Sequence, residues 1–354
     1  MSRKSSAQSK EAFVVKAAVL YGPEDLRITE CEKPKVGCKE VLVRIAACGI
    51  CTLEQRLFLG DQKIFYPLVA GHEASGIVEE VDEQVLADLK PGDRVALDLL
   101  NRCGECYFCR IGSDHLCENR FKKGLNLMGG FGEYVSVPAA QLFKISHGLT
   151  FEEAALTEPV STCVHSLNSL KLSAQETIVI SGVGIMGMLH VLLAKLRGIQ
   201  VIASDIDDSR LKQAEALGAD IVVNPEESPL RDVVKQATSG RGADAIVLAT
   251  PAQSAFTDAL SSVRLGGRIA LFAKSSKGFE IPVSPDHLHA KEITLIGVQG
   301  RTSRDFQEAV ALLNRGRLDL RPLVSNTVPL EQIEEGMKLA LDRSTYRVVV
   351  RMNT

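Results

Sequence analysis

Hydrophobic and polar positions follow different periods in the two halves of the chain. Up to about residue 137, short runs rich in β-branched residues are separated by Gly, Pro and Asp, a pattern typical of strands joined by turns. The clearest runs are FVVKAAVLYG (13–22), EVLVRIAACGI (40–50), ASGIVEEV (74–81) and DRVALDLL (93–100). This spacing predicts a compact β-barrel or sandwich with long functional loops.

After Thr150 the pattern changes to alternating helices and strands. Residues 151–172 carry apolar positions at helical spacing, and TIVISGVG (177–184) indicates a buried strand that runs into a Gly-rich turn. Strand-like runs then alternate with helical segments: VIASD, SRLKQAEALG, DIVV, LRDVVKQATS, DAIVLAT, SAFTDALSSV and GRIALFA, followed by ITLIGV. Such alternation predicts an α/β fold with a doubly wound parallel sheet and helices on both faces.

The last fifty residues predict a return to the first domain. FQEAVALLNRG (306–316) and EQIEEGMKLAL (331–341) have the periodicity of amphipathic helices, and TYRVVVRM (345–352) reads as a closing strand. We therefore expect a β-rich domain over 13–165 and 302–354, interrupted by a nucleotide-binding domain over 166–301. Residues 1–12 are polar, and we expect them to form a disordered tail.

Composition and charge narrow the class of partner. Of the 354 residues, 45% are hydrophobic and 24% are charged, as in ordinary globular proteins. The 41 basic and 44 acidic residues leave a net charge of −3, which gives no field that would attract nucleic acid or an anionic membrane. No apolar run approaches the ~20 residues of a membrane helix, and the N-terminus lacks the apolar core of a secretory signal. We expect a cytoplasmic protein whose partner is a small molecule.

A Gly-rich turn predicts a dinucleotide site. Gly182-Val183-Gly184-Ile185-Met186-Gly187 has the G-x-G-x-x-G pattern directly after a predicted strand. The glycines allow a tight turn, the approach of a pyrophosphate and close packing of helix on strand. Asp205 follows the next strand, where a carboxylate binds the ribose hydroxyls and repels a 2′-phosphate, so NAD is favoured. Arg210 lies near enough in sequence that NADP is not excluded.

The nine cysteines predict a metal site rather than disulfides. Nine is an odd number, and Cys103, Cys106, Cys109 and Cys117 cluster within a short segment at about 101–118. Two-residue gaps let neighbouring thiolates converge on one ion, and an all-cysteine set leaves no open position, so the pattern favours a structural zinc. An iron–sulfur cluster and four unrelated thiols are the alternatives, although the Pro typical of the ferredoxin pattern is missing after the last Cys.

A second group of residues has the composition of a catalytic zinc site. Cys51, His72, Glu73 and Glu158 combine the soft and hard ligands that open zinc sites use. Each residue alone is weak evidence, because a single His is commonly structural and Glu158 precedes a Pro at an expected helix start.

The order of several longer motifs indicates a family. They are Cys51, GHEASGIVEEV (71–81), KPGDRVAL (90–97), the four-cysteine lobe, GGFGEYVSVP (129–138), EPVSTCVHS (158–166) and GVGIMG (182–187). Together they resemble the zinc-dependent medium-chain dehydrogenase/reductases from about Val14 to Val350. GHEASGIVEEV and EPVSTCVH resemble the polyol (sorbitol-type) enzymes, whereas GVQGRTSRDF (297–306) looks more like the L-threonine 3-dehydrogenases.

The resemblance implies a Rossmann domain, a GroES-like catalytic domain and two zinc ions per chain. Cys51 and His72 would bind the catalytic zinc, with Glu73 as a ligand or exchangeable near-ligand and Glu158 at the fourth position, directly or through water. The implied reaction transfers hydride from a secondary alcohol of a polyol or related sugar to NAD and leaves a ketone. A homodimer or homotetramer is the implied assembly.

One stretch departs from the family pattern. The family carries Ser or Thr two residues after the ligand Cys, then Asp, and often His two residues further. This chain reads Cys51-Thr52-Leu53-Glu54-Gln55-Arg56, so Leu53 replaces the hydroxyl and Arg56 replaces the His. Leu53 cannot pass a proton, although Glu54 keeps the acid. Either Thr52 or Glu158 with ordered water replaces the relay, or the substrate is not an ordinary polyol.

Three alternatives stay open at this point. Arg56 and Arg301 are expected either to meet a polar or anionic substrate, to contact a cofactor phosphate, or to be solvated at the surface. The substrate would be L-threonine or another hydroxylated amino acid if Arg301 binds a carboxylate. A non-catalytic nucleotide-binding relative is the third alternative, supported by the altered relay. The remaining cysteines, Cys31, Cys38, Cys48 and Cys163, are predicted to be free thiols.

Overall fold

The structure, a computed structural model, describes residues 14–62, 64–120, 129–274 and 280–352. The tail expected over residues 1–12 lies outside the described residues. Packing divides the chain into two compact units. The first, here called the β-rich unit, comprises Met1–Asn101, Lys122–Ala155 and Val324–Thr354, and the second, the α/β unit, comprises Arg102–Phe121 and Leu156–Leu323.

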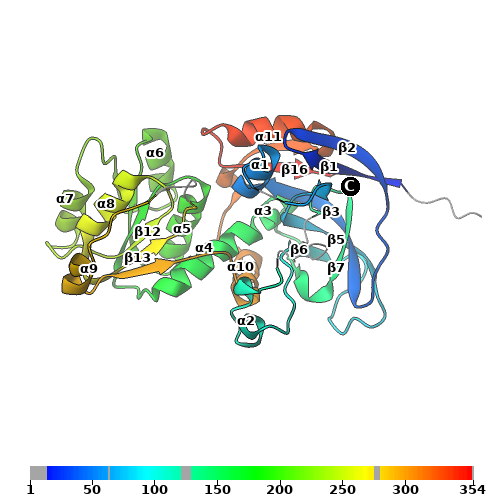
Figure 1. Cartoon of the computed structure of the whole chain (residues 1–354), viewed down its shortest axis with the longest axis horizontal. Coiled ribbons are helices and arrows are strands. Elements are labelled where there is room, and N and C mark those ends of the chain that lie inside the picture. The colour runs from blue at the N-terminus through cyan, green and yellow to red at the C-terminus, as the bar shows by residue number, and fades with distance from the viewer. Residues whose placement is uncertain (1–13, 63, 121–128, 275–279, 353–354) are drawn as a thin grey trace, which may run out of the picture. The chain divides into compact units, whose positions relative to one another are not determined.

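The β-rich unit holds most of the strands in the first half of the chain and the last strands of the chain (Figure 1). Its strands are β1 (Val14–Gly22), β2 (Asp25–Glu32), β3 (Glu40–Ile50), β4 (Leu68–Val69), β5 (Glu73–Val81), β6 (Arg94–Asp98), β7 (Tyr134–Pro138), β8 (Leu142–Lys144), β15 (Val324–Pro329) and β16 (Arg347–Arg351). Its helices are α1 (Thr52–Phe58), α3 (Phe151–Ala155) and α11 (Ile333–Leu341), with the 3-10 turns η2 (Ala139–Gln141) and η4 (Leu330–Gln332).

Strand β3 is the centre of this unit. In the described residues the larger sheet has the order β15-β16-β3-β5-β6-β8, and β7 pairs with the first half of β3. Gly49 of β3 lies opposite Glu73 of β5, and Ile50 lies opposite Val348 of β16. The end of β3, the start of β5 and the start of β16 therefore lie side by side at one end of the sheet. This arrangement brings Cys51, His72 and Arg347 close together.

The α/β unit contains the nucleotide-binding region and the cysteine lobe. Its strands are β9 (Thr177–Ser181), β10 (Gln200–Ser204), β11 (Ile221–Val223), β12 (Ala243–Leu248), β13 (Val263–Leu271) and β14 (Thr294–Gly297). Its helices are α2 (Tyr107–Arg110), α4 (Thr157–Leu170), α5 (Ile185–Leu196), α6 (Asp208–Ala216), α7 (Leu230–Ala237), α8 (Gln253–Ser262), α9 (Pro285–Lys291) and α10 (Ser303–Asn314), with the 3-10 turns η1 (Asp114–Leu116) and η3 (Arg321–Leu323).

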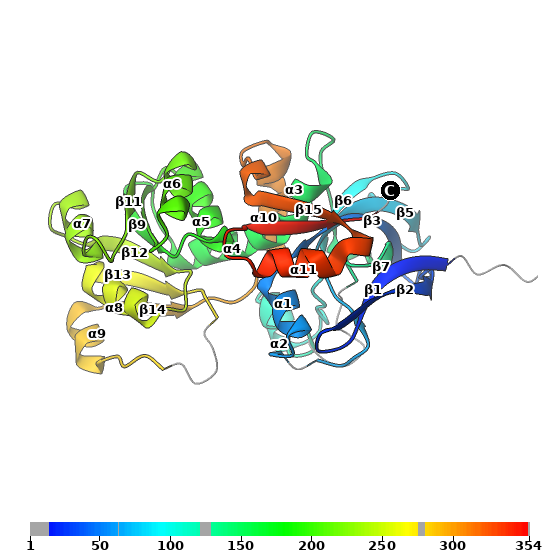
Figure 2. The ribbon, with the colours of Figure 1, turned by 90° about the horizontal axis from the view of Figure 1, so that it is seen from above.

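The sheet of the α/β unit confirms the predicted doubly wound architecture. Its order in the described residues is β11-β10-β9-β12-β13-β14, and every neighbouring pair is parallel. This is the dinucleotide-binding strand order, in which the chain reverses direction across the sheet beside the first strand, here β9. Figure 2 shows α5 and α6 on one side of the sheet and α8 and α9 on the other. All six residues of β12 are buried, as expected of a strand covered on both faces.

The region expected to be helical from 151 to 172 forms two helices, α3 and α4, which are separated at Leu156. The break falls between the two units, so α4 belongs with the α/β unit. There it packs against α10 and α5. The packing division thus differs from the boundaries 13–165, 166–301 and 302–354, which stay a prediction about the domains.

The described part of the chain contains no helix that is both long enough and apolar enough to cross a membrane.

Candidate active site and metal centres

Cys51 and His72 face each other at the edge where β3 ends and β5 begins. Cys51 is the N-cap residue of α1, and its Sγ accepts a hydrogen bond from Leu53 N. The distance between Cys51 Sγ and His72 Nε2 is 3.7 Å. Two ligands of one tetrahedral zinc, at the usual Zn–S and Zn–N bond lengths, are separated by about 3.6 Å. The pair therefore fits the spacing that a shared zinc ion requires.

Glu54 holds His72 from the other side of the ring. Its Oε1 lies 2.6 Å from His72 Nδ1, and its Oε2 accepts a hydrogen bond from Cys51 N at 3.1 Å. Glu54 is only 1% exposed. A carboxylate on Nδ1 directs Nε2 toward a metal, which is the arrangement found around zinc-binding histidines. The structure thus brings three of the predicted site residues together: Cys51, Glu54 and His72.

Burial and charge shift the pKa values of this group in opposite directions. Burial raises the pKa of the Cys51 thiol to about 11, and the Glu54 carboxylate adds to the rise. Burial alone lowers the pKa of His72, but the adjacent Glu54 and Cys51 outweigh it and raise that pKa well above its usual value. Burial likewise opposes ionisation of Glu54, whose pKa is nevertheless lowered by His72. Charge therefore links His72 favourably to Glu54 and to Cys51, whereas the Glu54 carboxylate disfavours the Cys51 thiolate.

Glu73 forms a buried ion pair that the sequence did not predict. Its Oε1 lies 2.9 Å from Arg347 Nη2, and both residues are buried. Arg347 Nη1 also donates to the carbonyl of Ile50 at 2.8 Å. The Arg347 guanidinium therefore contacts both Ile50, which precedes Cys51, and Glu73, which follows His72. The sequence signal for this role is weak: an arginine at the start of a strand whose three middle residues are valines.

Gly71 brings the His72 loop into close contact with the loop at 129–131. Its φ of +91° lies in the left-handed region. A Cβ at this position would lie 2.8 Å from Phe131 N and 2.9 Å from Cys48 Sγ. Burial raises the pKa of Cys48 well above its usual value. Cys48 is therefore buried, with its Sγ close to Gly71.

The helix that follows Cys51 also carries the residues where the chain departs from the family pattern. Thr52 is exposed at the first helical position, and Leu53 packs against the core of the β-rich unit. Arg56 is partly buried, and its Nε has no hydrogen-bond partner among the described residues. Gln55 Nε2 donates to the carbonyl oxygen of Ala340, in the last turn of α11, at 2.8 Å.

Glu158 and Arg301 form a close ion pair inside the α/β unit. Glu158 lies in the first turn of α4, and Arg301 directly precedes the N-cap residue of α10. The two residues are only 9% and 4% exposed. Thr162, one turn along α4, lies 3.5 Å from Glu158 Oε1 through its hydroxyl. The sequence left Arg301 as a substrate contact, a cofactor contact or a solvated surface residue. Its burial and its partner Glu158 show that the solvated alternative is wrong.

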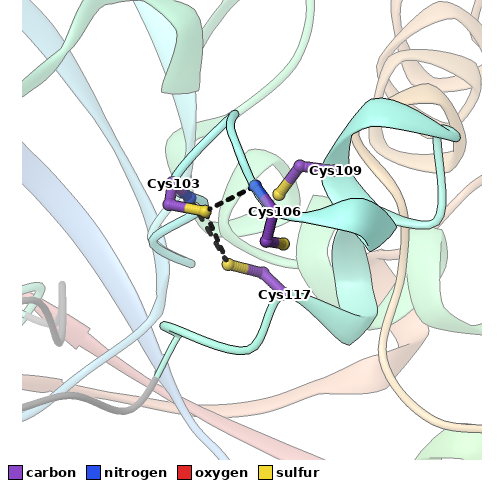
Figure 3. A group of neighbouring side chains, drawn as sticks. All are labelled: Cys103, Cys106, Cys109 and Cys117. Carbon is purple, nitrogen blue, oxygen red and sulfur yellow. Dashed lines mark hydrogen bonds between the residues drawn. The ribbon is translucent and has the colours of Figure 1, made fainter.

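The four cysteines of the lobe converge on one point (Figure 3). All four sulfur atoms lie within 4.8 Å of one another, and the distance from Cys117 Sγ to Cys103 Sγ is 3.6 Å. Sulfur ligands of a tetrahedral zinc are about 3.8 Å apart. Backbone N–H groups of Cys106 and Asn119 point at sulfur atoms at 3.4 Å. The geometry fits a closed zinc site with four thiolate ligands.

Hydrogen bonding makes the Cys103 thiolate unusually stable. Asn119, together with backbone N–H groups, lowers the pKa of Cys103 to about 6, whereas burial raises the pKa of Cys109 to about 12. A metal ion needs its cysteine ligands deprotonated, and donors aimed at Cys103 favour that state.

The Gly-rich turn has the geometry that a dinucleotide requires. Gly182 has a φ of +89°, and a Cβ at Gly187 would lie 2.0 Å from the carbonyl oxygen of Gly182, so both positions need glycine. Gly184 is the N-cap residue of α5, and a Cβ there would meet only Arg210 Nη1 at 3.9 Å. The turn therefore leaves room beside the first turn of α5, where Ile185 and Met186 follow, for a pyrophosphate.

Asp205 lies directly beside this turn. Its Oδ2 accepts a hydrogen bond from Val183 N at 2.7 Å, and its Oδ1 accepts one from Asp207 N at 3.1 Å. Each carboxylate oxygen can accept a further bond, so both remain able to bind ribose hydroxyls. Arg210 lies 3.9 Å from Asp207 through its Nε. A cation is therefore present near the end of β10, where a 2′-phosphate would lie.

Comparisons with known proteins agree with these sites. Residues 37–147 match the alcohol dehydrogenase GroES-like domain, and residues 182–315 match the zinc-binding dehydrogenase family. An alcohol dehydrogenase from Geobacillus stearothermophilus is 35% identical over 96% of this chain and 100% of its own length. An L-threonine 3-dehydrogenase from Symbiobacterium thermophilum is 32% identical over 90% and 92%, and a sorbitol dehydrogenase from Bacillus subtilis is 31% identical over 92% and 94%.

Solved structures are similar over nearly the whole chain. A protein from Sinorhizobium meliloti 1021, described as a zinc-binding dehydrogenase and bound to NADP, has a TM-score of 0.89 and 27% identity over 96% of this chain and 99% of its own. An alcohol dehydrogenase from E. coli CFT073 in complex with NADH has a TM-score of 0.87 and 27% identity over 96% and 99%. Both agree with the fold and with a nicotinamide cofactor.

The matched domains include parts of both units, and the relatives are named dehydrogenases. These findings favour an enzyme over a non-catalytic nucleotide-binding protein. The chain belongs to the zinc-dependent medium-chain dehydrogenase/reductase family and is an oxidoreductase that works with zinc and NAD(P).

Proposed function

We propose that this enzyme oxidises a secondary alcohol of a polyol or related sugar to the ketone, with NAD as the hydride acceptor. The observation that carries the proposal is the pairing of Cys51 Sγ with His72 Nε2 at 3.7 Å, with Glu54 on the opposite ring nitrogen. When bound, zinc supplies Lewis-acid chemistry that lowers the pKa of an alcohol, and NAD supplies the hydride acceptor.

The residues of the chain have separate proposed roles. Cys51 and His72 hold the catalytic zinc, and Glu54 keeps the His72 ring in the orientation that binds metal. Glu73, paired with Arg347, stabilises the strand ends that carry these ligands. We assign Glu158 to the fourth position of the zinc, directly or through water, on the basis of the family resemblance. Thr52 or Glu158, with ordered water, would carry the alcohol proton to solvent.

NAD is the proposed cofactor because Asp205 lies beside the Gly-rich turn. A carboxylate there accepts hydrogen bonds from both ribose hydroxyls and repels a 2′-phosphate. Arg210 weakens this preference, because its positive charge lies close to Asp207 in the same loop and would attract a 2′-phosphate.

L-threonine is the second candidate substrate. It is favoured by the segment GVQGRTSRDF and by the relatives named L-threonine 3-dehydrogenase. An amino-acid substrate needs a cation for its carboxylate. Arg301 is already paired with Glu158, whereas Arg56 lies on α1, one turn beyond Cys51. Arg56 is therefore the better candidate for binding an anionic group of a substrate.

A substrate screen with an Arg56 variant separates the two candidates. The zinc-loaded enzyme is assayed with NAD against xylitol, sorbitol, inositols and L-threonine by the absorbance of NADH. We expect the highest kcat/KM with a polyol, and a change of no more than about 2-fold for that polyol in Arg56→Met, because a neutral substrate makes no charged contact. Activity on L-threonine alone, with a kcat/KM that falls at least about 10-fold in Arg56→Met, would establish the second candidate instead.

A further inference from the structure

The cysteine lobe is attached to the N-terminus of α10 by charged side chains. Asp114, in η1 of the lobe, accepts hydrogen bonds from Ser303 N at 3.2 Å and from the Ser303 hydroxyl. Arg102, at the start of the lobe, lies 3.1 Å from Asp114 Oδ2 through its Nε. Its Nη2 donates to the carbonyl oxygen of Arg301 at 3.2 Å. The lobe therefore holds the backbone on both sides of Thr302, the N-cap residue of α10.

This attachment point is the backbone of the residue that binds Glu158. The Arg301 side chain pairs with the Glu158 carboxylate, and its guanidinium carbon lies 5.7 Å from the centre of the Phe306 ring. Both charges are almost fully buried. A buried ion pair is stable only in good geometry, and its partners depend strongly on each other. A shift of the Arg301 backbone would therefore displace the Glu158 carboxylate.

The lobe also contacts the helix that carries Glu158. The rings of His115 in the lobe and His165 in α4 lie 4.5 Å apart, centre to centre. His165 Nδ1 lies 2.8 Å from Asp305 Oδ2, which in turn accepts a hydrogen bond from Thr302 N at 3.0 Å. Glu158 and His165 are two helical turns apart and so lie on the same face of α4. The lobe thus supports both partners of the ion pair, α10 through Asp114 and α4 through His115.

We propose that Asp114 and Arg102 are positioning residues that hold Arg301 and, through it, the Glu158 carboxylate. The cysteine lobe would then control the rate of the reaction as well as the stability of the fold. The proposal rests on the proposed function in one respect, the assignment of Glu158 to the zinc site. It adds a role for the lobe that depends on its contacts with residues 301–303 rather than on its metal alone.

The first test is the variant Asp114→Asn, which removes the charge but keeps the size of the side chain. We expect kcat to fall by about 10-fold while the KM for NAD changes by less than about 2-fold, because Asp205 and the Gly-rich turn are untouched. The zinc content should equal that of the wild type. The matched control is Glu105→Gln, which removes an exposed carboxylate of the same lobe and should leave kcat within about 2-fold.

A double-mutant cycle shows whether Asp114 acts through Arg301. If it does, Asp114→Asn should lower kcat by less than about 2-fold in an Arg301→Met background, because the group it positions is already absent. An undiminished loss in that background would overturn the proposal. So would an unchanged kcat in the single variant.

A third readout does not need activity. Hydrogen–deuterium exchange of the wild type and both lobe variants should show faster exchange at 300–306 and at 157–162 in Asp114→Asn only. If the wild type shows no dehydrogenase activity, the proposed function fails, and this measurement still tests the positioning. Unchanged exchange at 157–162 in Asp114→Asn would contradict the coupling whatever the substrate is.

Discussion

At the scale of single residues, Glu54 contacts both proposed zinc ligands within the altered motif. The sequence indicated that Glu54 preserves the acid of a proton relay. In the structure its two oxygens contact His72 Nδ1 and Cys51 N. One carboxylate therefore orients one proposed ligand and caps the helix that begins at the other. Sequence alone could not show this, because an acid three residues after Cys51 is compatible with either role.

Glu73 illustrates a second limit of prediction at this scale. The family resemblance implies a zinc ligand or exchangeable near-ligand at this position, which stays a prediction, and the structure adds an ion pair that the sequence did not indicate. Its partner Arg347 lies at the opposite end of the chain, and no local pattern connects the two. Such pairs become visible only when the register of β16 on β3 and of β3 on β5 is known.

Asp205 carries the prediction about cofactor choice. Asp205→Ala removes the hydrogen bonds of a charged acceptor to the ribose, a loss of about 2 kcal/mol. This corresponds to roughly a 30-fold rise in the KM for NAD. The KM for NADP should change little or fall, because the repulsion of the 2′-phosphate is also removed. Initial rates with each cofactor at a saturating alcohol concentration measure both effects.

The control for cofactor choice is Asp208→Ala, which removes an exposed carboxylate of α6 next to the same loop. It should leave the ratio of the two KM values unchanged within about 2-fold. A wild-type enzyme that already prefers NADP would show that the assignment of Asp205 is wrong.

At the scale of secondary structure, the alternating strands and helices of the α/β unit were predictable, whereas two short helices were not. The run from 176 to 298 showed alternating apolar strands and helices, and β9 to β14 appear in the predicted places. The seven-residue helices α1 and α9 were not predicted. Each is too short to show a helical period, and α1 begins at a Cys that caps through its sulfur.

The lobe was recognisable from spacing alone because its ligands are close in sequence. The spacing of Cys103, Cys106, Cys109 and Cys117 indicates a metal knuckle without any knowledge of the fold. The attachment of the lobe to α10 was not predictable, because Asp114 and Ser303 are ordinary polar residues in sequence. Their contact depends on the arrangement of α4, α10 and the lobe within one unit.

Removal of one lobe ligand should destabilise the whole unit. Cys106→Ser leaves three thiolates for a site that needs four, and metal binding at such sites is folding free energy. We expect the midpoint of thermal unfolding to fall by roughly 10 °C or more. Differential scanning calorimetry measures this, with Cys38→Ser, an exposed cysteine outside the lobe, as the control. Equal midpoints for Cys106→Ser and the wild type would contradict a structural zinc.

At the scale of the whole molecule, the chain passes from the β-rich unit to the α/β unit and back more than once. The sequence predicted the large excursion, since the period of apolar residues changes near Thr150 and again near the C-terminus. It did not predict that the lobe packs with the α/β unit. A homodimer or homotetramer and a cytoplasmic location stay predictions.

Zinc content together with activity tests the central claim most directly. Metal analysis of the purified protein should find two zinc ions per chain in the wild type, one at the lobe and one held by Cys51 and His72. Cys51→Ala should lose one zinc ion and all measurable dehydrogenase activity while keeping the thermal stability that the lobe provides. A single zinc ion in the wild type, unaffected by Cys51→Ala, would contradict the catalytic zinc site.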